Sequence, residues 1–128
     1  MLESALQSGL ISAGATVELL GPMPTPGIAY LTRECEADGA IVISASHNPY
    51  EDNGIKIFDG KGEKLQDHDE LFIESLLAQP IKTVSAAELG KANRVIVAQE
   101  QYSGFCAGHV ASPLAIKDLK IVVDCANG

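Results

Sequence analysis

The chain has 128 residues and a formal net charge of −8, with 46% hydrophobic residues, 5% aromatic residues and no tryptophan. The negative charge argues against nucleic-acid binding, which needs a positive field around the phosphates, and the apolar content argues against disorder. A chain of this length can bury enough surface for one core, so we expect one small domain, or one domain and part of another. No apolar run approaches membrane-spanning length.

The first part of the chain alternates between helical and strand patterns. Apolar residues three and four apart predict a helix over residues 2–13, and residues 16–20 are typical of a short strand. A second helix is expected over about 26–37, with Thr25 as its N-cap. Residues 40–45 are almost continuously apolar, which favours a strand buried on both faces, as in a parallel sheet. This alternation indicates the α/β class.

Shorter elements are expected in the rest of the chain. They are a strand over residues 55–58, a helix over 66–79, a small strand over 95–97, a helix over 98–110 and a buried strand over 119–124. The helix over 66–79 carries four apolar residues on one face, which we expect to point inward: Leu71, Phe72, Leu76 and Leu77. A helix begins at residue 2, and the strand over 119–124 is followed only by the start of a turn at 126–128, so we expect the sequence to be cut at both ends.

The most reactive stretch follows the strand at 40–45. It contains the hydroxyl of Ser46, the imidazole of His47 and the ammonium group of Lys56. A serine hydroxyl is a poor nucleophile unless a base, a metal or a reactive partner activates it. Asn53-Gly54 predicts a tight reversal that would bring Lys56 back beside Ser46.

Spacing alone leaves the mechanism open. The same residues are typical of an ordinary turn in a non-catalytic α/β binding module, with Lys56 in solvent. A serine hydrolase is the sharper alternative. Against it, Ser46 and His47 would point apart on extended backbone, and the sequence has no G-x-S-x-G elbow.

A longer pattern supports a more specific interpretation. Ser44-Ala45-Ser46-His47-Asn48-Pro49, with Asn53-Gly54-Ile55-Lys56, resembles the active-site loop of the α-D-phosphohexomutases. Three further segments resemble landmarks of this superfamily: Gly21-Pro22-Met23-Pro24-Thr25-Pro26, Glu88-Leu89-Gly90-Lys91-Ala92 and Ile121-Val122-Val123-Asp124-Cys125-Ala126-Asn127-Gly128. The resemblance covers essentially the whole chain.

The resemblance implies a fold and a domain organisation. The fold is the three-layer α/β/α mixed sheet of phosphohexomutase domain I, truncated at its N-terminus, with the first strand of a second, similar domain. We accordingly expect residues 1–88 to be part of domain I, including the phosphoserine loop 44–56. Residues 89–128 would be a connecting segment and the start of domain II.

The resemblance also implies a reaction. Ser46 would carry a phosphoryl group and pass it to a hexose phosphate, giving a 1,6-bisphosphate that returns its other phosphate to the serine. The flanking segments are most similar to members that interconvert glucosamine 6-phosphate and glucosamine 1-phosphate for amino-sugar and cell-wall precursor synthesis. Glucose- and mannose-specific members are the alternative. The other catalytic candidates are His47 and Lys56, and the expected loop supports are Asn48, Asn53 and Gly54.

The implied cofactor is Mg²⁺, bound by the phosphate on Ser46 and by three aspartates of a D-G-D-G-D-R segment. A serine phosphate carries about −1.5 to −2 charges, which a metal ion and carboxylates can balance. That segment and the family's T-R-x-S-G segment are absent from these 128 residues. We therefore expect the chain alone to be inactive, and its exposed sheet edge to allow self-association.

The expected partner is a hexosamine phosphate, with no nucleic acid and no membrane. The three cysteines have neither disulfide-framework nor zinc-site spacing, which is typical of a reduced, cytoplasmic protein.

Overall fold

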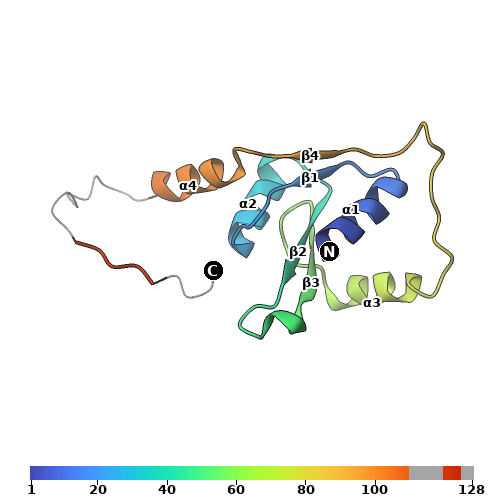
Figure 1. The fold of residues 1–128 in the computed structure, drawn as a ribbon, viewed down its shortest axis with the longest axis horizontal. Coiled ribbons are helices and arrows are strands. Elements are labelled where there is room, and N and C mark those ends of the chain that lie inside the picture. The colour runs from blue at the N-terminus through green and yellow to red at the C-terminus, as the bar shows by residue number, and fades with distance from the viewer. Residues whose placement is uncertain (110–119, 125–128) are drawn as a thin grey trace.

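The computed structural model describes residues 1–109 and 120–124. Its elements, in chain order, are α1 (Leu2–Ser12), β1 (Val17–Leu19), α2 (Thr25–Glu34), β2 (Gly39–Ser44), the 3₁₀-helix η1 (Tyr50–Asp52), β3 (Gly54–Asp59), α3 (Asp67–Leu76), β4 (Ala92–Arg94) and α4 (Ala98–Gly108) (Figure 1). The α/β class expected from the sequence is confirmed. Among the described helices, none combines the length and the apolar character needed to cross a bilayer.

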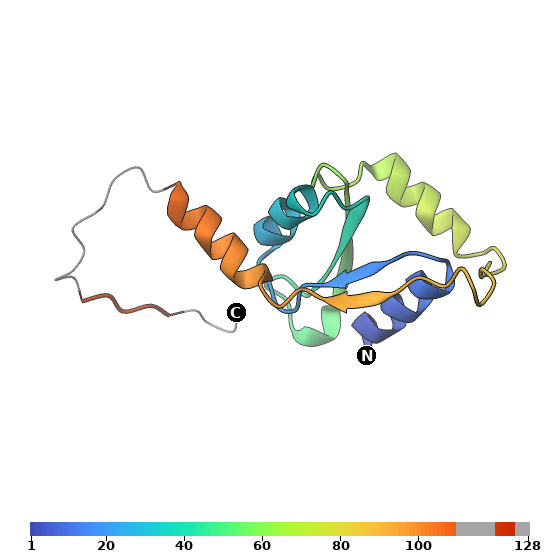
Figure 2. The same cartoon turned by 90° about the horizontal axis from the view of Figure 1, so that it is seen from above.

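The described strands form two separate pairs. β1 and β4 are parallel and lie side by side in Figure 2. β2 and β3 form an antiparallel hairpin, in which Gly39 pairs with Asp59 at one end and Ser44 with Gly54 at the other. We expected β2 to lie in a parallel sheet. Within the described part of the chain this expectation is wrong, because β2 pairs with β3 in the antiparallel direction. The chain reverses in residues 45–53 and returns beside β2, so the partner is the strand next in sequence.

The core lies where α2 covers one face of the hairpin. Ile28 of α2 packs with Val42 of β2 and Phe58 of β3, and each of these side chains is 8% exposed. Leu31, one helical turn after Ile28, is 1% exposed. Side chains alternate between the two faces along a strand. Val42 and Phe58 lie on the same face of the hairpin, and α2 covers this face and shields them from solvent.

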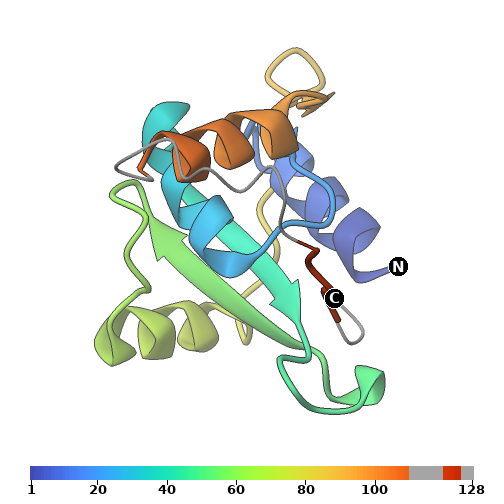
Figure 3. The same cartoon turned by 90° about the vertical axis from the view of Figure 1, so that its left-hand side faces the viewer.

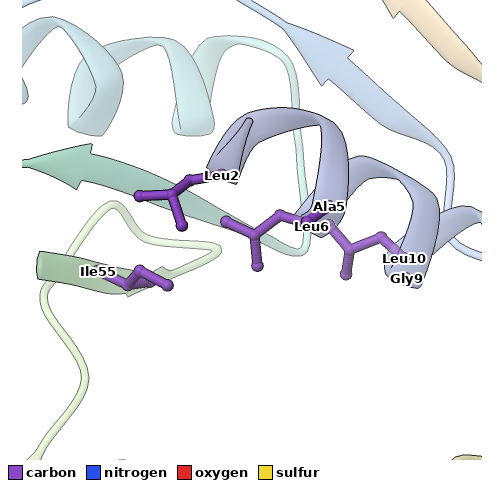
Figure 4. A pocket seen from close by; sticks show the side chains of 6 residues that line it. All are labelled: Leu2, Ala5, Leu6, Gly9, Leu10 and Ile55. Atoms are coloured by element: carbon purple, nitrogen blue, oxygen red, sulfur yellow. The ribbon is translucent and has the colours of Figure 1, made fainter. Parts of the chain in front are cut away.

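The other face of the hairpin is turned toward α1. Ile55 of β3 and the apolar side of α1 line an open, apolar hollow beside the strand (Figure 4). The α1 residues at its wall are Leu2, Ala5, Leu6, Gly9 and Leu10. Their three- and four-residue spacing is the pattern that predicted this helix, so the periodicity identified both the helix and its apolar side.

α3 does not bury its apolar side chains in the described structure. Leu71 and Phe72 are each 64% exposed and Leu77 is 82% exposed, so their expected inward orientation is wrong. Leu76 is 41% exposed. Periodicity determines which side chains share a helical face, whereas burial also needs an apolar partner. α3 lies at the outer side of the hairpin (Figures 1 and 3), where it does not pack extensively against any other described element.

Three smaller expectations also differ from the structure. The N-cap of α2 is Pro24 rather than Thr25, which is already helical. The strand expected at 95–97 lies at Ala92–Arg94, where it can pair with β1. Residues 120–124 are exposed and form no strand, while residue 119 lies outside the described residues.

The segment 84–91 closes the C-terminal end of α1. The backbone N–H groups of Val84 and Gly90 donate to the carbonyls of Ser12 and Ile11 at 2.9 and 3.0 Å. These carbonyls belong to the last turn of the helix, and that of Ile11 also accepts the N–H of Gly14 at 3.0 Å. A segment distant in sequence thus adds two hydrogen bonds to the C-terminal end of α1 and leads into β4.

Candidate active site

The candidate site is the loop of residues 45–53, which joins β2 to β3. It extends beyond the strands and away from α1 and α2 (Figures 1 and 3). The last strand pair, Ser44 with Gly54, holds both ends of the loop, and η1 occupies its second half. Ser46 and His47 are exposed. The sheet therefore presents an accessible serine on a loop whose two ends are hydrogen-bonded together.

Ser46 has an unusual backbone conformation. Its φ is +56°, in the left-handed region that residues with a Cβ rarely adopt. The N–H of Asn48 donates to the carbonyl of Ala45 at 2.9 Å, which closes a four-residue turn with Ser46 at its second position. A positive φ at that position is characteristic of type I′ and II′ turns. The positive φ of Ser46 thus makes this a primed turn rather than an ordinary type I or II turn.

A second hydrogen bond fixes the same peptide from the other side. The N–H of Ser46 donates to the Oγ of Ser44 at 3.0 Å. This N–H and the carbonyl of Ala45 belong to one peptide unit, so both of its polar groups are hydrogen-bonded. Sequence reasoning missed this function of Ser44. The available signal was the S-x-S spacing, because a serine side chain readily bonds the backbone two residues on.

The imidazole of His47 lies beside the candidate nucleophile. The Nδ1 atom of His47 is 3.4 Å from the Oγ of Ser46. The expectation that these two side chains point apart is wrong, because it assumed extended backbone, whereas Ser46 is left-handed. Among the described residues, no carboxylate hydrogen-bonds the imidazole of His47. The orienting acid of a serine hydrolase triad is thus missing from this arrangement.

Lys56 does not lie directly beside Ser46, as the sequence predicted, but farther from the loop, within the paired part of the hairpin. It is half-buried in β3, directly opposite Val42 of β2, and lies on the hairpin face that carries Ser44. Asn53 and Gly54 do not form the tight reversal expected of them. Gly54 is the first residue of β3, and the side-chain amide of Asn53 donates to the carbonyl of Tyr50 within the loop. Within the described residues, no hydrogen bond or ion pair joins Lys56 to Ser46.

The described residues do not form a metal site by themselves. They contain no cluster of three or more His, Cys, Asp or Glu side chains placed to hold a metal ion. Mg²⁺ prefers several oxygen ligands in octahedral geometry. A phosphate on Ser46 would supply one part of such a site, and nearby acidic side chains, Glu51 and Asp52, are exposed in η1 without converging on it.

The chain matches one known protein family over more than half of its length. Residues 1–84 match the family model described as phosphoglucomutase/phosphomannomutase, alpha/beta/alpha domain I. The chain belongs to this family. The match covers 84 of the 128 residues, so the similarity extends well beyond the loop at 44–56.

Relatives agree along the entire chain. Over all 128 residues, it is 59% identical to the phosphoglucosamine mutase of Ectopseudomonas mendocina. It is 57% identical to the phosphoglucosamine mutases of Alkalilimnicola ehrlichii and Haemophilus influenzae, again over its full length. The chain spans 28–29% of the length of these three relatives.

Proposed function

We propose that residues 1–128 belong to a phosphoglucosamine mutase in which Ser46 carries the phosphoryl group. The observation that carries this proposal is an exposed serine, held in a left-handed turn at the end of a hairpin, within a phosphohexomutase domain. The names of the relatives support glucosamine phosphate as the substrate. A group that transfers phosphate must be accessible to a sugar, and Ser46 meets that requirement.

The proposed reaction has two phosphoryl transfers. In the first, the free 1-hydroxyl oxygen of glucosamine 6-phosphate attacks the phosphorus of phosphorylated Ser46. The bond from phosphorus to Ser46 Oγ breaks, and the proton of the sugar hydroxyl passes to a base. After the bisphosphate reorients, Ser46 Oγ gives up its proton and attacks the phosphorus of the 6-phosphate. The bond from that phosphorus to the sugar O6 breaks, O6 takes up a proton, and glucosamine 1-phosphate leaves the restored phosphoserine. Positioning and charge stabilisation dominate such transfers.

We assign supporting functions to the neighbouring residues on chemical grounds. His47 is close enough to Ser46 to hydrogen-bond the Oγ atom and to exchange a proton with it. Lys56 supplies positive charge near the base of the loop and can take part in proton transfer to the sugar. Asn48 closes the turn through its backbone, Asn53 bonds inside the loop, and Gly54 begins the returning strand.

The cofactor in this proposal is Mg²⁺. When bound, it would balance the negative charge of the two phosphates. Within this chain the phosphate on Ser46 is its only assigned ligand, and we expect the carboxylates that complete the site elsewhere in the whole protein. Residues 1–128 alone should therefore show no mutase activity.

The domain assignment also stays a proposal. We assign residues 1–88 to domain I and 89–128 to a connection leading into domain II, and the family match over 1–84 supports the first part. The pairing of β4 with β1 adds Ala92–Arg94 to the structural unit around β1. Self-association of residues 1–128 stays a prediction, as does a cytoplasmic location.

Phosphoryl transfer to Ser46 can be measured directly. The full-length protein is incubated with glucosamine 1,6-bisphosphate and Mg²⁺, and its intact mass is followed. We expect the original protein to gain one phosphoryl group and Ser46→Ala to gain none. The control variant Ser8→Ala, at an exposed serine of α1, should gain one phosphoryl group like the original protein. A phosphoryl group that remains on Ser46→Ala would refute the assignment.

Turnover assays then identify the sugar. We expect the largest kcat/KM for glucosamine 6-phosphate, compared with glucose 6-phosphate and mannose 6-phosphate. A preference for either neutral sugar would replace the proposed substrate while keeping the phosphoserine chemistry.

A further inference from the structure

We propose that Ser44 is a positioning residue, whose hydroxyl orients the nucleophile Ser46 through the backbone. The inference rests on the proposed function of Ser46, and it assigns Ser44 no contact with the sugar or the phosphate. Its starting point is the hydrogen bond from the N–H of Ser46 to the Oγ of Ser44, 3.0 Å long.

The peptide unit between Ala45 and Ser46 is fixed by two partners. Its carbonyl accepts the N–H of Asn48 at 2.9 Å, and its N–H donates to Ser44 Oγ. The first bond recurs in any closed turn of this kind and uses backbone atoms alone. The second depends on a particular side chain. Ser44 is thus the partner of this peptide unit that can be removed by changing a side chain while every backbone N–H is kept.

The orientation of this peptide determines where the hydroxyl of Ser46 lies. With φ at +56°, the Cα–Cβ bond of Ser46 leaves the backbone in a direction that extended or right-handed backbone does not offer. In this conformation Oγ lies 3.4 Å from His47 Nδ1. The left-handed conformation is unfavourable for a residue with a Cβ, so interactions elsewhere must hold Ser46 there.

Ser44 is well placed to supply such an interaction. It is the last residue of β2, is half-buried and pairs with Gly54, so the hairpin fixes its backbone. Gly54, the strand partner of Ser44, has no side chain that could cover the Ser44 hydroxyl. A Cβ added at residue 54 would have one neighbour within 4 Å, the Ser44 carbonyl oxygen at 3.7 Å. The hydroxyl of Ser44, on a backbone that the hairpin fixes, thus holds the backbone N–H of Ser46 in the loop.

A pair of variants with nearly equal shape tests this function. Ser44→Thr keeps a hydroxyl, whereas Ser44→Val replaces it with a methyl group. In the full-length protein, we expect Ser44→Thr to be phosphorylated by the bisphosphate at close to the original rate. Ser44→Val should slow this transfer and lower kcat by about tenfold to a hundredfold, the scale of a misplaced reacting group, with KM for the sugar nearly unchanged.

A second measurement does not depend on activity. In residues 1–128, the intraresidue NOE between the amide proton and Hα of Ser46 is strong when φ is positive. We expect this NOE to persist in Ser44→Thr and to weaken in Ser44→Val, with an otherwise unchanged amide spectrum. If the original protein takes up no phosphoryl group, the proposed function fails, and the NOE still tests the effect of Ser44 on the backbone.

Two results would overturn the inference. One is a Ser44→Val variant that keeps both the transfer rate and the NOE of Ser44→Thr, since the hydroxyl would then be unnecessary. The other is a Ser44→Thr variant as impaired as Ser44→Val, because packing rather than the hydrogen bond would then explain the loss.

Discussion

Gly90 lies against the backbone of Ala15 so closely that a Cβ on residue 90 would overlap the Ala15 carbonyl oxygen. The N–H of Gly90 donates to the Ile11 carbonyl at 3.0 Å, and the N–H of Val17 donates to the Lys91 carbonyl at 2.7 Å. Two segments more than seventy positions apart thus meet backbone to backbone, and their contact leads directly into the β1–β4 pair. The absence of a side chain at residue 90 permits this approach.

We therefore expect Gly90→Ala to lower the free energy of unfolding. Backbone atoms cannot rotate away as a side-chain end can, so the loss should be about 3 kcal/mol, the upper part of the usual range for overpacking. Gly104→Ala is the matched control, because it lies within α4 with open space around it and should stabilise by about 0.5–1 kcal/mol. Urea denaturation of residues 1–128 measures both. Equal effects of the two substitutions would contradict the close contact.

The left-handed backbone of Ser46 predicts that glycine is more stable than alanine at this position, the reverse of their order within a helix. Ser46→Ala and Ser46→Gly both remove the hydroxyl, but glycine adopts a φ of +56° without a Cβ clash. Ser46→Gly should therefore be more stable than Ser46→Ala by about 1 kcal/mol. At Ser8, within α1, the same comparison should favour alanine by about 1 kcal/mol. The difference between denaturation curves measures each pair, and a preference for alanine at position 46 would contradict the assigned backbone.

Glu88 should titrate below its usual range. The hydroxyl of Ser85 donates to Glu88 Oε2 at 2.8 Å and the N–H of Ser85 at 3.2 Å. These two bonds stabilise the ionised carboxylate and lower the pKa of Glu88 from 4.5. Since the folded pKa is the lower one, this group stabilises the fold above about pH 4.5. That contribution is lost as the pH falls through the lowered pKa.

Carbon-13 NMR of the Glu88 carboxyl measures this shift. Ser85→Ala removes the larger of the two causes, so the pKa of Glu88 should rise toward 4.5. Ser103→Ala, at an exposed serine of α4, should leave the titration of Glu88 unchanged. A Glu88 titration that Ser85→Ala does not move would show that these hydrogen bonds are absent in solution.

Local sequence patterns predicted where the helices lie, but they did not predict which helical side chains are buried. The spacing of apolar residues located α1, which spans Leu2–Ser12. The same type of pattern located α3, yet Phe72 is 64% exposed. Periodicity is a property of the segment itself, whereas burial depends on what lies against it.

The candidate site shows the same division. The sequence by itself determined the α/β class and the family, and it led to the proposal of Ser46, since these depend on residue order and on a long, specific pattern. The tertiary structure alone decided that β2 pairs with β3, that Ser46 is left-handed, and that Lys56 lies opposite Val42. These features depend on strand register and on hydrogen bonds such as that from Ser46 to Ser44, and residue order within one segment does not specify them.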